Sequence, residues 1–136
     1  MMRFGKSNAH ATILQGIRSA LDPQQLVALR ADDKQYHDDV LQNILTYIYG
    51  CRFGIAAFER IEGDDFNPNI SFEVGYMTGL GKSVCLLKDR TLRTLHTDLI
   101  GRLYCEFDTQ DCTTTIAPVL QKWMSDKGIL TIEKAA

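Results

Sequence analysis

The chain has 136 residues, of which 45% are hydrophobic and 24% are charged, as in an ordinary globular protein. A formal net charge of -2, with no run of five basic residues, argues against a nucleic-acid partner. No apolar stretch approaches the ~18 residues that a membrane-spanning helix needs, so no membrane partner is expected. The length predicts a single domain over residues 1–136.

Short apolar runs alternate with segments of helical periodicity along the chain. In chain order they predict a strand at Met1–Phe4, a helix capped by Asn8 that ends near Asp22-Pro23, a strand at Leu26–Arg30, a helix at Tyr36–Tyr49, a strand at Arg52–Phe58, a helix that begins at Pro68, strands at Ser83–Lys88 and Tyr104–Asp108, and a helix at Thr113–Ser125. Central strands without polar alternation belong to a parallel sheet covered on both faces. The expected fold is therefore α/β, a flavodoxin-like three-layer arrangement with a five-stranded parallel sheet in the order 2-1-3-4-5.

The four cysteines, Cys51, Cys85, Cys105 and Cys112, form no Cys-x-x-Cys pair and have no histidine at ligand spacing. No metal site is expected from them, and such thiols are typical of a reducing compartment. The first residues also lack the apolar region of a signal peptide. These observations predict a cytoplasmic protein.

The segment Asn67–Lys82 carries the main functional signal. Asn67 can cap a helix, and Pro68 suits its first position. The apolar positions that share one face of this helix are Ile70, Val74, Met77 and Leu80. Glu73 falls within that face, where a carboxylate must be paired, hydrogen-bonded or protonated. The phase of Glu73 predicts a ligand-facing carboxylate; the alternative is a structural ion pair with a neighbouring arginine.

Further candidate contacts follow from the rule that ligands bind outside the carboxyl ends of parallel strands. The residues near those ends that could contact a ligand are Phe4, Gly5, Lys6, Arg30, Asp32, Phe58, Asn67 and Asn69. Gly5 allows close backbone approach, and Lys6 is either a phosphate contact or a solvated loop residue. Arg30 and Asp32 either pair with each other or hold a ribose and phosphate. The two asparagines are capping residues first. The isolated histidines, His10 among them, are expected to be exposed or hydrogen-bonded rather than catalytic.

Three motifs together resemble a known group of proteins. They are Phe4-Gly5-Lys6, Arg30-Ala31-Asp32, and Asn67-Pro68-Asn69-x-x-x-Glu73-x-Gly75-Tyr76 followed by Gly81-Lys82 and an apolar strand. Over about residues 1–108 the chain is similar to the TIR-like and nucleoside 2-deoxyribosyltransferase-like proteins. In that group a glutamate on the helix after the third strand is the catalytic residue, which corresponds to Glu73. The chain lacks the Trp-Cys-x-x-Glu form of many NAD-cleaving TIR domains and the Asp-Gly-Thr of many deoxyribosyltransferases.

The resemblance implies cleavage of the N-glycosidic bond of NAD or of a related nucleotide or nucleoside, in a defence or signalling effector that self-associates. A carboxylate beneath the ribosyl centre would stabilise or attack its oxocarbenium character. One carboxylate suffices when nicotinamide leaves, because nicotinamide departs neutral, whereas a nucleoside base needs a proton from a residue such as Asp65, Asp89 or Asp32. NAD is then a substrate, and no cofactor is expected. The alternative is a non-catalytic module that senses a nucleotide or assembles.

Overall fold

The sheet of the computed structural model is parallel and has three strands within the described residues, which are 1–2, 7–60, 68–92 and 104–130. Its order is β1 (Gly54–Phe58), β2 (Val84–Asp89) and β3 (Cys105–Phe107). Ala57 lies opposite Leu87, which in turn lies opposite Cys105. These strands confirm the last three of the five expected strands, with slightly different ends.

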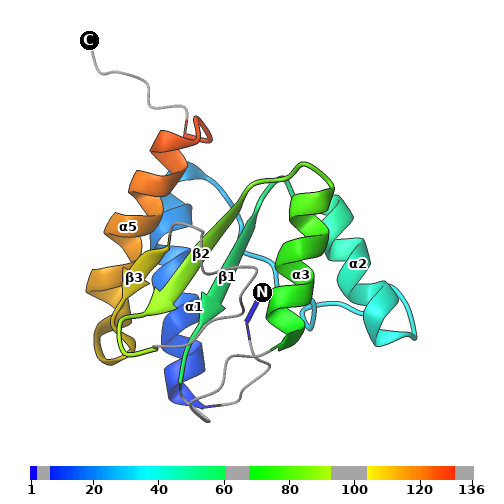
Figure 1. Cartoon of the computed structure of the whole chain (residues 1–136), viewed down its shortest axis with the longest axis horizontal. Coiled ribbons are helices and arrows are strands. Elements are labelled where there is room, and N and C mark those ends of the chain that lie inside the picture. Colours follow the sequence, from blue (N-terminus) through cyan, green and yellow to red (C-terminus); the bar gives the residue numbers. More distant parts are fainter. Residues whose placement is uncertain (3–6, 61–67, 93–103, 131–136) are drawn as a thin grey trace.

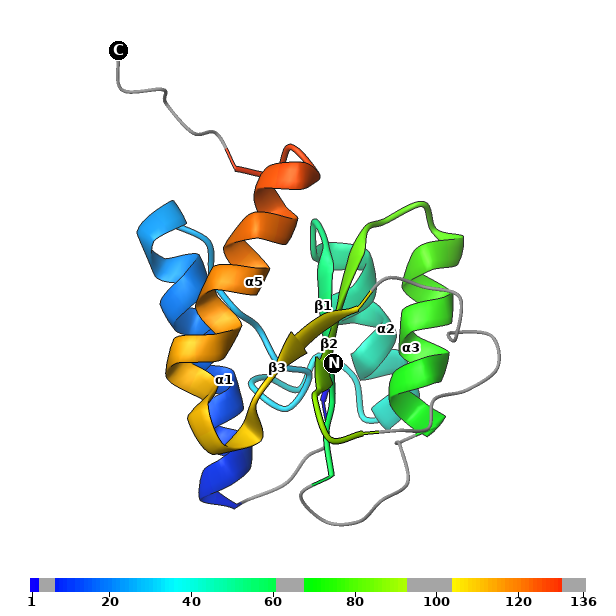
Figure 2. The ribbon, with the colours of Figure 1, turned by 60° about the vertical axis from the view of Figure 1, so that its left-hand side comes forward.

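Helices cover both faces of the sheet, which Figure 2 shows nearly edge-on (Figures 1 and 2). Helices α1 (Asn8–Leu21) and α5 (Cys112–Asp126) lie side by side on one face. Helix α3 (Pro68–Gly79) covers the other face, with α2 (Val40–Gly50) beside it. Two short 3-10 turns, η1 (Asp22–Gln24) and η2 (Thr109–Asp111), complete the described elements. None of the helices in the described ranges combines the length and apolar character needed to cross a bilayer.

The sheet separates two hydrophobic cores. The core under α1 and α5 contains Ala57 and Leu87, whereas the core under α3 contains Ala56 and Leu86. Successive residues of each strand therefore enter opposite cores, as the two-residue period of a strand requires. This arrangement explains why β1 and β2 are continuous apolar runs. The chain is accordingly a mixed α/β protein with helices on both sides of a parallel sheet.

The N-terminal residues lie beside β1. The Met1 nitrogen donates to the Ile55 carbonyl at 2.8 Å, and the Met1 carbonyl accepts from the Ala57 nitrogen at 2.9 Å. Both bonds use the edge of β1 opposite to the one that faces β2, because the Gly54 nitrogen donates to Ser83 on that other edge. The rest of the expected first strand, residues 3–4, lies outside the described residues.

The prediction of a second strand at Leu26–Arg30 is wrong, because the structure has no strand at these residues. Its side chains do alternate, since Val27 and Leu29 are 79% and 55% exposed while Leu26 and Ala28 pack on the core under α1 and α5. A strand also needs a hydrogen-bonded neighbour, and nothing in the described ranges forms a ladder with this segment. Alternation therefore reflects one-sided packing of an extended segment, and the five-stranded order is not seen.

Several helix boundaries differ from the sequence prediction because side chains cap the helices elsewhere. Ser7, not Asn8, caps α1, with its Oγ accepting from the His10 nitrogen at 3.3 Å. Asp39 caps α2 in the same way, so this helix starts after the expected Tyr36. Leu80 lies beyond the end of α3 and is 39% exposed, so it does not extend the apolar face of that helix.

The late start of α2 follows from the buried amide of Asn43. Its Oδ1 accepts from the backbone nitrogens of Tyr36 and His37 at 2.6 and 3.2 Å. Its Nδ2 donates to the carbonyls of Ala31 and Lys34 at 2.8 and 3.0 Å. With both ends of the amide bonded, residues 31–37 fold over α2 as a loop instead of extending the helix.

Lys82 holds the other end of α2. Its Nζ donates to the carbonyls of Ile48, Tyr49 and Cys51 at 2.8, 2.7 and 2.7 Å. A cation at this position satisfies carbonyls left open at the end of the helix and complements its dipole. Gly81 precedes it with a φ of +77°, a left-handed conformation that favours glycine. The Gly81-Lys82 pair thus has a structural role in joining α2 to the turn before β2.

Replacing Lys82 with Met is expected to lower the free energy of unfolding by about 1–3 kcal/mol, because three charged hydrogen bonds are lost while the apolar stem is kept. Urea denaturation measures this change. The control is Lys122→Met, which removes an exposed pair with Asp126 and should cost less than about 0.5 kcal/mol. Equal losses in the two variants would contradict a role for Lys82 at the end of α2.

Candidate functional site

A cavity of about 330 Å³ lies beside the first half of β1. It is lined by residues 50–55, by Met1 and Met2, by residues 26–31 and by side chains of α1, α2 and α3. Most of the lining is apolar, and the volume falls within the range of small-molecule sites. The described charged residues that line it are Arg30, Arg52 and Glu73.

Glu73 reaches this cavity because α3 runs back along the sheet from the carboxyl end of β1. One turn after Glu73, Met77 lies so close to β1 that a Cβ added to Gly54 would be 2.5 Å from the Met77 Sδ. Ile70, Val74 and Met77 are buried, whereas Glu73 is partly buried at the side of the same face. The structure thus confirms that the carboxylate is partly withdrawn from solvent.

Burial raises the pKa of the Glu73 carboxyl above its usual value, because desolvation penalises the charged form. The positively charged amino group of Met1 opposes part of this shift. The net effect is a carboxylate that is less stable when ionised than one in water. Such a group interacts strongly with any cationic centre that enters the cavity.

Arg30 is the second predicted residue that lines the cavity. Its Nη2 lies 2.8 Å from the Asp32 Oδ2, so the structure shows the first of the two alternatives, pairing with Asp32, and the contact with a ribose and phosphate stays a prediction. The Arg30 side chain is 16% exposed and that of Asp32 is 47% exposed. Asp32 itself does not line the cavity. The pair therefore presents a guanidinium to the cavity and a carboxylate to solvent.

The structure separates other predicted contacts from Glu73. Phe58, the last residue of β1, is 1% exposed and packs in the core under α3, so it does not line the cavity. Asn69 is exposed in the first turn of α3 and is also absent from the lining. Phe4, Gly5, Lys6 and Asn67 lie outside the described residues. The cavity is bounded by the beginning of β1, not by the carboxyl end where the sequence placed the site.

Among the polar residues of the cavity, Tyr47 and Arg52 were not singled out from the sequence, and Cys51 was considered only as a metal ligand. Tyr47 lies in α2, and Cys51 is the residue that follows this helix. Arg52 lies in the segment that leads into β1. The helical phase of Tyr47, one turn before Cys51, was the available signal. That signal shows only that the two face the same side, and the position of α2 beside β1 was needed to bring them to the cavity.

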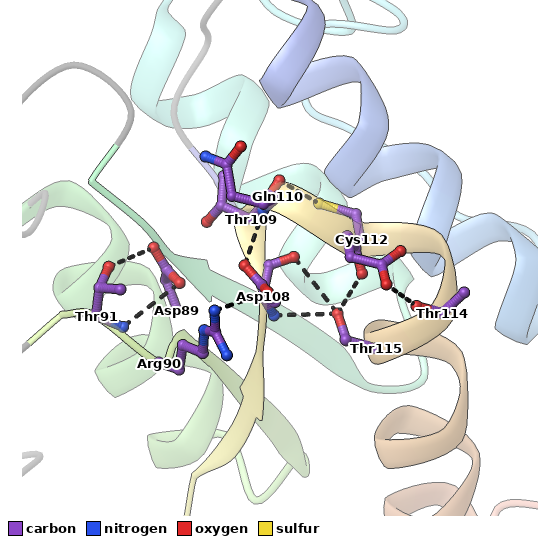
Figure 3. Close-up of polar contacts among 10 residues, drawn as sticks. Asp89, Arg90, Thr91, Asp108, Thr109, Gln110, Cys112, Thr114 and Thr115 are labelled. Carbon is purple, nitrogen blue, oxygen red and sulfur yellow. Dashed lines mark hydrogen bonds and ion pairs between the residues drawn. The ribbon is translucent and has the colours of Figure 1, made fainter.

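The carboxyl ends of β2 and β3 carry a separate polar network, which Figure 3 shows. The Asp89 Oδ2 accepts from the Thr91 hydroxyl at 2.9 Å, and the Asp108 Oδ1 accepts from the Gln110 nitrogen at 3.0 Å. Arg90 pairs with Asp108 at 3.2 Å. The Asp89 carboxylate thus stabilises the local turn after β2, and the Asp108 carboxylate caps η2. In the described part of the chain, no cluster of three or more potential metal ligands is found.

Beyond the end of β1, His10 and Glu59 form a third polar group. The His10 Nε2 lies 3.3 Å from the Glu59 Oε1, and the two residues are 0% and 2% exposed. Of the two expected environments for His10, exposed or hydrogen-bonded, the structure shows the hydrogen-bonded one. Neither residue lines the Glu73 cavity.

The chain matches no family model, no curated protein and no solved structure. The resemblance to the TIR-like and nucleoside 2-deoxyribosyltransferase-like proteins therefore stays a prediction.

Replacing Glu73 with Gln is expected to raise the free energy of unfolding near neutral pH. Because the pKa of Glu73 is raised on folding, the folded state binds more protons than the unfolded state as the group titrates, and ionisation lowers stability as pH rises. The gain of the variant should shrink as pH falls through the raised pKa of folded Glu73 towards the usual value of 4.5, and it should be absent below that value. Urea unfolding across this pH range measures it.

Glu106→Gln is the control, since the Glu106 side chain is 61% exposed and should give no such gain. A lower stability of Glu73→Gln at neutral pH would instead assign Glu73 to a structural ion pair.

Proposed function

We propose that this chain cleaves an N-glycosidic bond of NAD or of a related nucleotide or nucleoside, with Glu73 as the catalytic residue. The observation that carries the proposal is a partly buried carboxylate of raised pKa on a mainly apolar cavity of about 330 Å³. Cleavage of such a bond generates positive charge at the ribosyl centre. A desolvated carboxylate is the group that this charge stabilises most, because little water screens the attraction.

The chemistry requires one well-placed carboxylate when nicotinamide leaves. The electron pair of the glycosidic bond moves to the pyridinium nitrogen, so nicotinamide departs neutral and needs no proton. Glu73 then stabilises the oxocarbenium-like centre or bonds to it, and water completes hydrolysis. The ionised form of Glu73 is destabilised by burial in the free protein, and the developing cation relieves that penalty in the transition state.

NAD is favoured over a nucleoside by the charges around the cavity. Among the described lining residues Glu73 is the one carboxylate, so a departing base would find no second acid there to protonate it. Arg30 and Arg52 add two guanidinium groups, which suit the phosphates of a dinucleotide. The proposal therefore treats NAD as a substrate and includes no further cofactor.

The proposal extends to a flavodoxin-like arrangement of the sheet. Met1 lies on the edge of β1 that does not face β2, and this position supports a first strand beside β1. The partial order is then 1-3-4-5 in the numbering of the expected strands. Activity in the cytoplasm, as a defence or signalling effector, belongs to the same proposal.

Self-association is the second part of the proposal. The exposed apolar side chains that support it also support the alternative of a non-catalytic assembly module. Several large apolar side chains of α2 and α3 are exposed: Val40, Leu41, Tyr49 and Phe72. Exposed apolar side chains gathered on neighbouring helices favour contacts with another protein surface. A module of this kind would bind a nucleotide without turning it over.

Glu73→Gln is expected to abolish most NAD cleavage while the protein stays folded. Loss of about 3–4 kcal/mol of transition-state stabilisation lowers kcat by two to three orders of magnitude. Chromatographic separation of nicotinamide from NAD measures turnover, at both low and high protein concentration to allow for assembly. Glu106→Gln is the matched control and should retain full activity. Equal turnover of Glu73→Gln and wild type would refute the catalytic role, and absence of turnover in assembled wild type would favour the assembly module.

Arg30→Gln is expected to separate the two substrate classes. Losing a charged contact to phosphate should raise KM for NAD about tenfold, which corresponds to about 1.4 kcal/mol, and leave KM for a nucleoside unchanged. Initial-rate kinetics on both substrates measure the difference. Arg90→Gln is the control, because Arg90 pairs with Asp108 at the carboxyl end of the sheet. A similar rise of KM for both substrates would show that Arg30 does not contact phosphate.

A further inference from the structure

An exposed serine, a buried histidine and a buried glutamate lie in a hydrogen-bonded row at the start of α1. The Ser7 Oγ lies 2.6 Å from the His10 Nδ1, and the His10 Nε2 lies 3.3 Å from the Glu59 Oε1. The side chains of His10 and Glu59 are 0% and 1% exposed, whereas Ser7 is exposed. The row joins the amino terminus of α1 to the residue that follows β1.

The hydrogen bonds of Ser7 indicate how the protons are distributed. The Ser7 Oγ already accepts from the His10 backbone nitrogen at 3.3 Å, so its own hydrogen is free to be donated to the His10 Nδ1. An Nδ1 that accepts requires a neutral ring with its proton on Nε2, and this N–H points at the Glu59 carboxylate. The sequence of groups is then hydroxyl, imidazole base and orienting carboxylate.

This order is the one that activates a serine nucleophile. The imidazole can take the hydroxyl proton, and a carboxylate on its far nitrogen fixes the ring and stabilises the imidazolium that forms. Burial of His10 and Glu59 strengthens that interaction, because water does not screen it. Capping of α1 requires only the Ser7 oxygen and gives no reason for a buried imidazole–carboxylate pair behind it.

We propose that Ser7 is an activated nucleophile that accepts acyl groups from small esters, at a second reactive site separate from the Glu73 cavity. The Ser7 Oγ bonds to the ester carbonyl carbon while its proton moves to the His10 Nδ1. The ester C–O bond then breaks, and the alcohol leaves with that proton. Water, deprotonated by the same nitrogen, releases the acid and restores Ser7.

The test exposes the whole chain to a fluorophosphonate probe and, separately, to p-nitrophenyl acetate, with intact mass and peptide mapping as readouts. We expect one adduct per chain on Ser7. Ser7→Asp, which keeps a capping oxygen but removes the nucleophile, should fold normally and lose the adduct. Ser19→Ala is the control, since Ser19 is exposed on the same helix and bonds to the Gln15 carbonyl. It should keep the adduct.

Glu59→Gln tests whether Glu59 supports the activation of Ser7, because this substitution keeps the size of the side chain and removes the charge that stabilises the His10 imidazolium. Labelling of a folded Glu59→Gln should be slower by about 10²-fold or more. An unlabelled wild type, or equal labelling of Ser7→Asp, would overturn the proposal. So would unchanged labelling of Glu59→Gln. Where Glu59→Gln does not fold, the comparison of Ser7→Asp with Ser19→Ala decides whether Ser7 is the nucleophile.

Discussion

The position of β1 between two hydrophobic cores is the constraint from which the rest of the structure follows. Its residues alternate between two cores, so helices must cover both faces of the sheet. One edge of β1 is paired with β2, and the other edge carries Met1. The cavity lies on this second edge. Its walls are residues 50–55, the extended segment 26–31 and side chains of three helices. The place where a ligand can enter is thus set by the surroundings of one strand.

A partly buried carboxylate and a buried one near this strand, Glu73 and Glu59, show how environment separates chemical roles. Glu73 faces an apolar cavity, and its pKa is raised because desolvation outweighs the nearby positive charge. Glu59 lies beyond the other end of β1 and contacts a buried imidazole. A carboxylate that faces a cavity is suited to stabilise a transient positive charge on a ligand. One held against an imidazole is suited to orient that ring.

Two residues of the sequence motif, Gly81 and Lys82, have structural explanations, and so does Asn43 outside it. Lys82 binds three carbonyls at the end of α2, and Gly81 adopts a left-handed conformation before it. Asn43 ties the loop after Arg30 to the start of α2. These contacts position α2 and Arg30 around the cavity. They also show that a motif residue can act on a site by placing the elements that form it.

The sequence by itself determined the α/β class, the strands β1, β2 and β3, the approximate helical positions and the inward phase of Glu73, because each depends on local periodicity and propensity. Tertiary structure alone decided that Leu26–Arg30 forms no ladder with any of the described residues and that Phe58 turns into the core. It also decided that the cavity lies at the start of β1. Hydrogen-bonded neighbours, strand facing and cavity walls depend on residues far apart in the chain. The row of Ser7, His10 and Glu59 is the clearest case, since 49 residues separate its histidine from its carboxylate and no local pattern connects them.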